Sequence, residues 1–146
     1  MFSKACEYAI RATLYISKAT SKGSRIGIKK IAKEISSPEP FTAKILQTLS
    51  REGIISSVKG PNGGFYIDPD ARPIPLNSIV QAFDGDPLLT CTLGLKECSN
   101  KFPCPIHHEI KEYKNHVQKF LKEKTIQDLT QELSKGKTFL KIGKQG

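Results

Sequence analysis

Two short helical patterns with a proline-containing break between them constrain the fold of this chain most strongly. In the first, residues 28–35, apolar side chains recur at helical spacing at Ile28, Ile31, Ala32 and Ile35. The second, residues 38–53, predicts a helix with one buried side formed by Phe41, Ile45, Leu46 and Leu49. We expect Ser37 to cap this second helix, with Pro38 at its first position. The pair predicts a helix-turn-helix.

A turn rich in glycine follows the second helix. The segment SVKGPNGGFYI spans residues 57–67, and its Asn62–Gly63 step favours a hairpin because both residues of such a turn must tolerate a positive φ. A hairpin directly after a helix-turn-helix forms a wing. We therefore predict a winged helix-turn-helix unit over residues 1–75, which begins with a helix from a capping Ser3 to about Ala19.

The rest of the chain is predicted to be helical, so the expected fold class is mainly α with a small β-hairpin wing. Residues 76–83 predict about two helical turns. A long helix is expected from Pro105 to about Lys124, with Cys104 as its cap, and a short one after Thr125. We group residues 76–133 as a cysteine-rich loop with a long dimerisation helix. Residues 134–146 are expected to form a basic, disordered tail.

Positive charge is concentrated in the first half of the chain. Residues 1–60 hold eleven Lys and Arg against four Glu, a net charge of +7, whereas the whole chain carries +9. Such a field predicts a surface that binds a polyanion, although a solvated surface with a lysine excess would look similar. We expect the second helix of the pair to enter the major groove of double-stranded DNA. The expected DNA contacts from this helix and the wing are Thr42, Lys44, Gln47, Thr48, Arg51, Lys59 and Asn62.

The long helix carries a narrow apolar seam. Its members alternate at spacings of four and three residues: Ile106, Ile110, Tyr113, Val117 and Phe120. A stripe this narrow suits a partner helix, although an ordinary core helix remains the alternative. We expect the seam to join two copies of the chain, because a protein that reads few base pairs per subunit gains specificity from two half-sites.

Three of the four cysteines lie in one loop, with the spacing Cys91-x6-Cys98-x5-Cys104-x2-His107. The pattern lacks the paired C-x2-C knuckles of most structural zinc sites. Thiolates, together with histidine, are ligands of iron–sulfur clusters, and we expect such a cluster here. A Cys3His zinc site, a thiol-based redox switch and three free thiols are the alternatives. Cys6 lies on the apolar side of the first helix and is expected to fill the core.

Several classes of protein are not expected. No apolar run approaches the length of a membrane span, and Glu7 and Arg11 interrupt the apolar stretch that a signal peptide would need. We expect a cytoplasmic protein without membrane contact, whose thiols are kept reduced. The sequence has no H-E-x-x-H motif, phosphate-binding glycine loop or nucleophile triad, so we do not expect an enzyme.

In their order along the chain, these features resemble the Rrf-type winged-helix transcription regulators. That family includes the regulator of iron–sulfur cluster assembly and the nitric-oxide-sensitive repressor. The resemblance covers residues 1–133, and its most specific marks are EYAIRA (7–12), IAKEI (31–35), LQTLSREGIISSVKGPNGGF (46–65) and the three loop cysteines. It implies a homodimer that crosses through the long helix, binds a palindromic promoter site and changes its DNA affinity with the state of the cluster.

The resemblance leaves two candidates for the fourth cluster ligand. His107 corresponds to the histidine of the assembly regulator, and Glu7, supplied by the other subunit, to the acidic residue of the nitric-oxide repressor. We favour His107. The first cysteine gap holds six residues, whereas the assembly regulator has five, so the number of irons is not carried over. We expect a 2Fe–2S cluster rather than a 4Fe–4S cluster.

Overall fold

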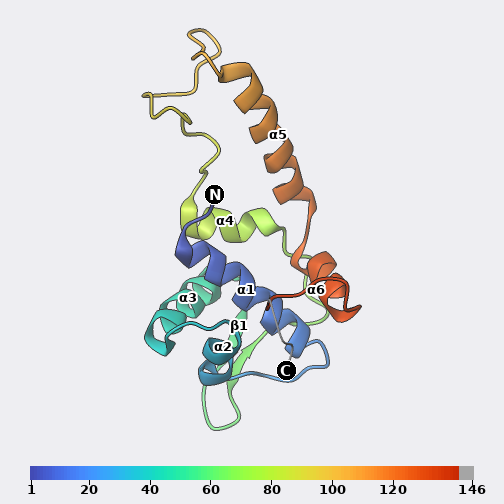
Figure 1. Cartoon of the computed structure of the whole chain (residues 1–146). Coiled ribbons are helices and arrows are strands. Elements are labelled where there is room, and N and C mark those ends of the chain that lie inside the picture. The colour runs from blue at the N-terminus through green and yellow to red at the C-terminus, as the bar shows by residue number, and fades with distance from the viewer. Residues whose placement is uncertain (142–146) are drawn as a thin grey trace.

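The computed structural model describes residues 1–141, and residues 142–146 lie outside the described part. It has a helical body from which a loop and one long helix project (Figure 1). The elements in chain order are α1 (Lys4–Ala19), α2 (Ile28–Glu34), α3 (Glu39–Arg51), β1 (Ser56–Val58), β2 (Gly64–Tyr66), α4 (Leu76–Asp84), α5 (His107–Glu123) and α6 (Ile126–Ser134). The predicted fold class, mainly α with a β-hairpin wing, is confirmed.

Helix α1 forms the centre of the body. As predicted, it begins after Ser3, whose hydroxyl oxygen accepts a hydrogen bond from the backbone N–H of Cys6 at 3.1 Å. Its inner face is fully buried at Cys6, Ala9, Ala12 and Ile16. This face packs against α3, α4 and α6, so one helix connects the predicted DNA-binding part with the base of the projection. Cys6 is a core residue, as expected.

Helices α2 and α3 form the predicted helix-turn-helix, with a corrected start for α3. Pro38, not Ser37, is the capping residue, and the helix begins at Glu39 with Pro40 in its first turn. The reason lies in the turn. Ser36 adopts a left-handed φ of 54°, and the N–H of Ser37 donates to the carbonyl of Ala32, so the chain reverses one residue later than the Ser-Pro pattern indicated.

The wing is an antiparallel hairpin with Ser57 opposite Phe65. Its second strand also pairs with the segment before α2, because Ile26 and Phe65 exchange two backbone hydrogen bonds of 2.9 and 2.7 Å. Glycine is required at the turn: a Cβ on Gly63 would lie 2.0 Å from the carbonyl oxygen of Val58, and one on Gly64 would lie 2.7 Å from that of Ile26. Strand β2 is therefore paired along both edges, with β1 on one side and with Ile26 on the other.

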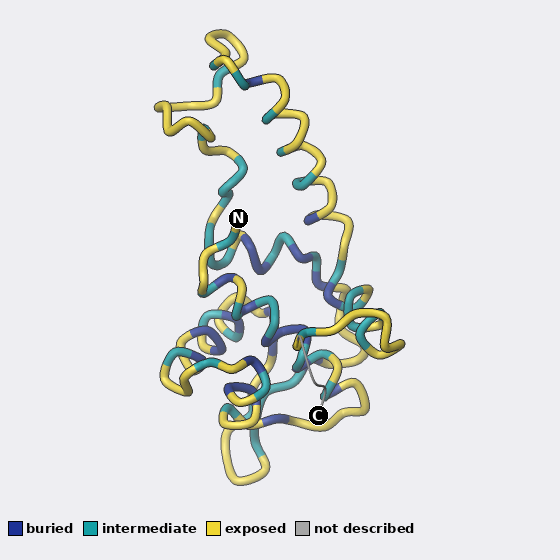
Figure 2. The backbone as a smooth tube through the Cα atoms, in the orientation of Figure 1, coloured by how far each residue is buried: buried dark blue, intermediate teal, exposed yellow. Residues whose placement is uncertain are grey.

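The segment from α4 through loop 85–106 to α5 leaves the body and returns to it; α4 lies at the base, and the loop and α5 form the projection (Figure 1). Its two ends are joined at the base, where the N–H of Leu76 donates to Lys124 at 2.9 Å and the N–H of Ile126 donates to Ile74 at 2.8 Å. Thr125 caps α6 as predicted, in a capping box with Asp128, and α6 packs against α1. Figure 2 shows that the loop and the outer side of α5 are largely exposed.

The start of α5 differs from the prediction. The helix begins at His107 and Ile106 is its capping residue, so Pro105 is not the first helical residue and Cys104 is not the cap. A separate turn precedes the helix, closed by a 3.0 Å hydrogen bond from the N–H of His107 to the carbonyl of Cys104. The thiol of Cys104 is therefore not placed on the positive end of α5.

The predicted tail, residues 134–146, begins with the last residue of α6 and continues as turns as far as Lys141. Leu140 packs against the core, and the ammonium of Lys141 lies 3.0 Å from the carboxylate of Glu34. Leu140 and Lys141 therefore contact the body, which we did not expect of a disordered tail; residues 142–146 of that prediction lie outside the described residues. Over residues 1–141, no helix is both long and apolar enough to cross a membrane.

Candidate functional site

The outer face of α3 carries the predicted groove-reading residues. Lys44, Gln47 and Arg51 are exposed, whereas Ile45, Leu46 and Leu49 on the opposite face are buried. Thr48 is half-buried, and its hydroxyl donates to the carbonyl of Lys44 at 3.2 Å. Helix α3 therefore offers solvent two cationic side chains and an amide, which match phosphates and base edges.

Thr42 is a correction to the predicted DNA contacts. It is fully buried, and its hydroxyl donates a 2.9 Å hydrogen bond to the carbonyl of Pro38. Its position three and four residues before Ile45 and Leu46 places it on the inner stripe of the helix. Thr42 supports the start of α3 and does not reach DNA.

The wing adds cationic and polar groups beside the turn before α2. Lys59 and Asn62, two of the expected DNA contacts, are exposed on the hairpin loop. Asn62 and Gly63 line a shallow surface depression together with Gly23 and Arg25. The guanidinium of Arg25 also lies over the ring of Tyr66, at 5.5 Å from its centroid. The sequence analysis missed Arg25, because only the pairing of Ile26 with Phe65 brings it to the wing.

The cysteine loop brings its ligand candidates together as two pairs. The Sγ of Cys98 lies 3.5 Å from Nδ1 of His107. Cys104 is a neighbour of Cys91 and forms the second pair with it, and its thiol contributes to lowering the pKa of Cys91. The pKa of Cys91 is lowered by hydrogen bonds from the backbone at Leu95 and Leu93, by the charge of Lys114 and by the Cys104 thiol. A lowered pKa favours the thiolate, the form that binds metals.

His107 is the buried member of this group, with 3% of its surface exposed. Its Nε2 lies 2.9 Å from Oδ1 of Asn100, and the ammonium of Lys111 donates to the same oxygen at 2.7 Å. A cavity of about 170 Å³ adjoins these three residues and Cys98, with Leu88 and Leu89 in its apolar wall. The sequence analysis missed Asn100 and Lys111 as neighbours of His107, because Asn is common in turns and nothing else in the sequence distinguished Asn100.

The donor set fits an iron–sulfur cluster in its chemistry. Three thiols and an imidazole are soft ligands of the kind that such clusters use. Within residues 1–141, no three His, Cys, Asp or Glu side chains lie close enough together to hold a metal ion. The two pairs would therefore have to approach each other, and the exposed loop between Cys91 and Cys104 is free of helix and strand. The residues supply the right atoms on a backbone that can rearrange.

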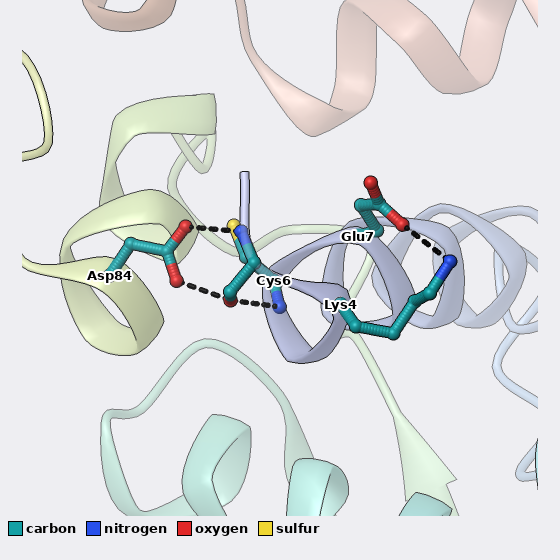
Figure 3. Close-up of polar contacts among 5 residues, drawn as sticks. Lys4, Cys6, Glu7 and Asp84 are labelled. Atoms are coloured by element: carbon teal, nitrogen blue, oxygen red, sulfur yellow. Dashed lines mark hydrogen bonds and ion pairs between the residues drawn. The ribbon is translucent and has the colours of Figure 1, made fainter. Parts of the chain in front are cut away.

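Glu7, the alternative fourth ligand, lies in the first turn of α1. Its carboxylate is 3.3 Å from the ammonium of Lys4, and Figure 3 shows it pointing away from Cys6 and Asp84. Because Glu7 is exposed, a second subunit could reach it. Among residues 1–141 of a single chain, Glu7 and the loop cysteines do not form a group that could hold a metal ion.

The predicted seam of α5 is only partly covered. Tyr113 is 54% exposed and Phe120 is 45% exposed, whereas Ile106, Ile110 and Val117 are half-buried. Val117 packs against the core, and so does the buried Leu121, which the seam did not include. One side of α5 therefore packs toward α4, while two large aromatic side chains face solvent.

Comparison with known proteins identifies the family to which this chain belongs. A family model described as Rrf2, iron-dependent transcriptional regulator, matches residues 2–132. The chain belongs to the Rrf2 family. As an Rrf2 protein it is a DNA-binding transcription regulator. The resemblance noted from the sequence is thereby confirmed.

Individual relatives agree with this assignment to the Rrf2 family. The chain is 36% identical over 132 residues to a putative HTH-type transcriptional regulator of Aquifex aeolicus, covering 88% of this chain and 90% of that protein. CymR, the global cysteine regulator of B. subtilis, has a similar structure with a TM-score of 0.73, 20% identity, and coverage of 90% of this chain and 96% of that one. IscR of T. potens gives a TM-score of 0.71 at 18% identity and covers 95% and 92%. The two solved structures support the winged-helix fold.

Proposed function

We propose that this Rrf2 protein is a homodimeric regulator whose affinity for promoter DNA is controlled by an iron–sulfur cluster bound to loop 85–106. The observation that carries the proposal is the 3.5 Å contact of Cys98 with the buried His107, in a loop that also carries Cys91 and Cys104. Three thiols in this loop and an imidazole at the start of α5 are the ligand types that iron–sulfur clusters use. The description of the family as iron-dependent agrees with a cluster.

In this proposal, Cys91, Cys98, Cys104 and His107 hold the cluster. A bound cluster supplies a group that gains or loses electrons and reacts with oxygen or nitric oxide. The 2Fe–2S form remains our expectation, and Glu7 of the other subunit is the alternative to His107. A zinc ion on the same residues, or a thiol switch without metal, is the second candidate. The lowered pKa of Cys91 supports it, because both chemistries use the thiolate.

The DNA contacts proposed for α3 are Lys44, Gln47, Thr48 and Arg51, with Lys59 and Asn62 from the wing. Arg25 joins this set because it lies over the wing residue Tyr66. Exposed cations lie on α3, on the wing and before α2, and this spread over three segments suits more than one stretch of phosphate backbone. A palindromic site follows if two such surfaces are related by a two-fold axis.

The dimer contact is proposed for the exposed side of α5. Tyr113 and Phe120 are large apolar groups that a second copy would remove from water. The loop that carries the cysteines leads directly into α5, so ligands that order the loop also bias the start of this helix. Because α5 would be shared by both subunits, its position sets the spacing of the two α3 helices.

The test is the metal content of protein purified without oxygen from cells of its natural host. We expect iron and acid-labile sulfide in equal amounts, visible absorption, and loss of all three in Cys98→Ala and His107→Ala. Cys6→Ala is the matched control, because Cys6 is a core residue of α1 and is not one of the proposed ligands. Retention of the cluster in His107→Ala and its loss in Glu7→Gln would identify Glu7 as the fourth ligand. Zinc in place of iron would support the second candidate.

A further inference from the structure

Asn100 connects two residues of α5 in the cysteine loop. Its Oδ1 accepts a 2.7 Å hydrogen bond from the ammonium of Lys111, and the same oxygen lies 2.9 Å from Nε2 of His107. On the other side of the imidazole, Nδ1 lies 3.5 Å from Sγ of Cys98. A chain of four side chains thus runs from Lys111 through Asn100 and His107 to Cys98.

The chemistry of Lys111 fixes how the amide of Asn100 is oriented. An ammonium group has donors and no lone pair, so the amide atom that it contacts must be the oxygen. An Asn amide with its nitrogen in that place would set two donors against each other. The orientation of Asn100 therefore follows from its bond with Lys111 and does not depend on how its oxygen and nitrogen are told apart.

The orientation of the amide in turn fixes the proton on His107. Because Oδ1 of Asn100 is an acceptor, Nε2 of His107 must carry the hydrogen of their 2.9 Å bond. A histidine that binds a metal is neutral and has one ring proton. With that proton on Nε2, the lone pair is on Nδ1, the nitrogen that faces Cys98.

We propose that Asn100 is a positioning residue that holds the proton of His107 on Nε2 and so makes Nδ1 the nitrogen that binds the cluster. This inference rests on the proposed function of the loop. Histidines that bind metals commonly donate their second N–H to an oxygen acceptor, which fixes the ring and raises its basicity. Asn100 supplies that acceptor, and Lys111 holds the acceptor in place.

The first test uses cluster-free protein under reducing conditions, with its histidines labelled with 15N. Long-range 1H–15N correlation spectra distinguish the two neutral tautomers of each ring. We expect His107 to be the Nε2–H tautomer in the wild type and a mixture of tautomers in Asn100→Ala. Asn100→Asp keeps an oxygen acceptor and should restore the single tautomer. Asn77→Ala, the same change on α4 and outside the lining of the cavity beside His107, is the matched control and should leave the spectrum unchanged.

The second test follows the cluster. In reconstituted protein we expect the visible absorption of Asn100→Ala to disappear about tenfold faster than that of the wild type when an iron chelator is added, with near-complete recovery in Asn100→Asp. In wild-type protein with labelled histidine, hyperfine coupling of the reduced cluster should identify Nδ1 as the bound nitrogen. An unchanged lifetime in Asn100→Ala, or coupling to Nε2, would overturn the inference.

These results separate the inference from the proposed function. A wild-type His107 with its proton on Nδ1, or a single Nε2–H tautomer that persists in Asn100→Ala, would refute the role of Asn100 even if the cluster is present. A protein that shows the expected tautomers but takes up no iron would count against the proposed function alone.

Discussion

The backbone N–H of Ser3 donates a 2.8 Å hydrogen bond to the carboxylate of Asp84, 81 residues further along the chain. The hydroxyl of Ser3 donates to the other carboxylate oxygen. Figure 3 shows Asp84 beside Cys6. Asp84 is the last residue of α4, where the cysteine loop begins. The loop is therefore anchored to the start of α1, and α1 packs against α3. This contact is a physical connection between the candidate cluster loop and the groove-reading helix.

Asp84→Ala is expected to lower the free energy of unfolding by about 1 kcal/mol, because Ser3 loses its acceptor and the cap of α1 loosens. Urea denaturation followed by circular dichroism measures the change. Asp86→Ala, two residues later at the start of the loop, is the matched control and should have little effect. Equal stability of the two variants would show that the Ser3–Asp84 contact adds nothing.

Cys6 is expected to behave unlike the loop cysteines. Burial, followed by the charge and hydrogen bond of Asp84, raises its pKa from 9.0 to about 12. In cluster-free protein at pH 8, an alkylating reagent should modify Cys91, Cys98 and Cys104, and modify Cys6 only after unfolding. Mass spectrometry of the digested protein checks this. Rapid modification of Cys6 in the folded protein would contradict its placement in the core.

The same shift gives the stability a pH dependence. The folded protein keeps the Cys6 proton up to about pH 12, whereas the unfolded chain releases it near 9.0. The contribution of this proton to stability is therefore complete below pH 9 and is lost as the pH rises from 9 toward 12. The free energy of unfolding of the wild type should fall more steeply in this range than that of Cys6→Ala. Parallel curves would contradict the shift.

Arg51 and Thr42 are expected to differ in their effect on DNA binding, although both lie on α3. Arg51→Ala should weaken binding by about 1–3 kcal/mol if the side chain reads a base, or reduce the salt slope by about one if it contacts a phosphate. Thr42→Val keeps the shape of a buried side chain and should leave DNA affinity unchanged while lowering stability by about 1 kcal/mol. Fluorescence anisotropy with a duplex selected by this protein from a random pool measures both.

The opposite pattern would contradict the orientation of α3. If Thr42→Val weakened DNA binding without loss of stability, the buried hydroxyl would have to reach the groove. If Arg51→Ala changed neither affinity nor salt slope, Arg51 would lie outside the interface.

Local sequence signals predicted most of the helices, because each helix shows its buried side as a periodic stripe. Capping by Ser3 and Thr125 was also predictable, since a cap depends on residues within one turn. Thr42 was wrongly predicted to face DNA because polar residues usually lie on the exposed side of a helix. Its spacing to Ile45, Leu46 and Leu49 is that of the buried stripe, and the carbonyl of Pro38 satisfies its hydroxyl.

Contacts between distant segments were not predictable from such signals. The pairing of Ile26 with Phe65, which brings Arg25 to the wing, joins residues that no short pattern connects. The contact of Asn100 with His107 depends on the path of an irregular loop. Because of the same path, α5 begins at His107 and not at Pro105 as predicted. The sequence showed which residue types form the candidate site, but not that His107 contacts Cys98 and Asn100.

The most direct test of the central claim is the dissociation constant for the selected duplex, measured without oxygen on the same preparation with its cluster and after the cluster is removed. We expect the two constants to differ by about tenfold or more, within the usual range for coupled sites, and Cys98→Ala to match the cluster-free protein. Equal constants, or a native preparation that is colourless and free of iron yet binds DNA fully, would contradict control of DNA binding by a cluster.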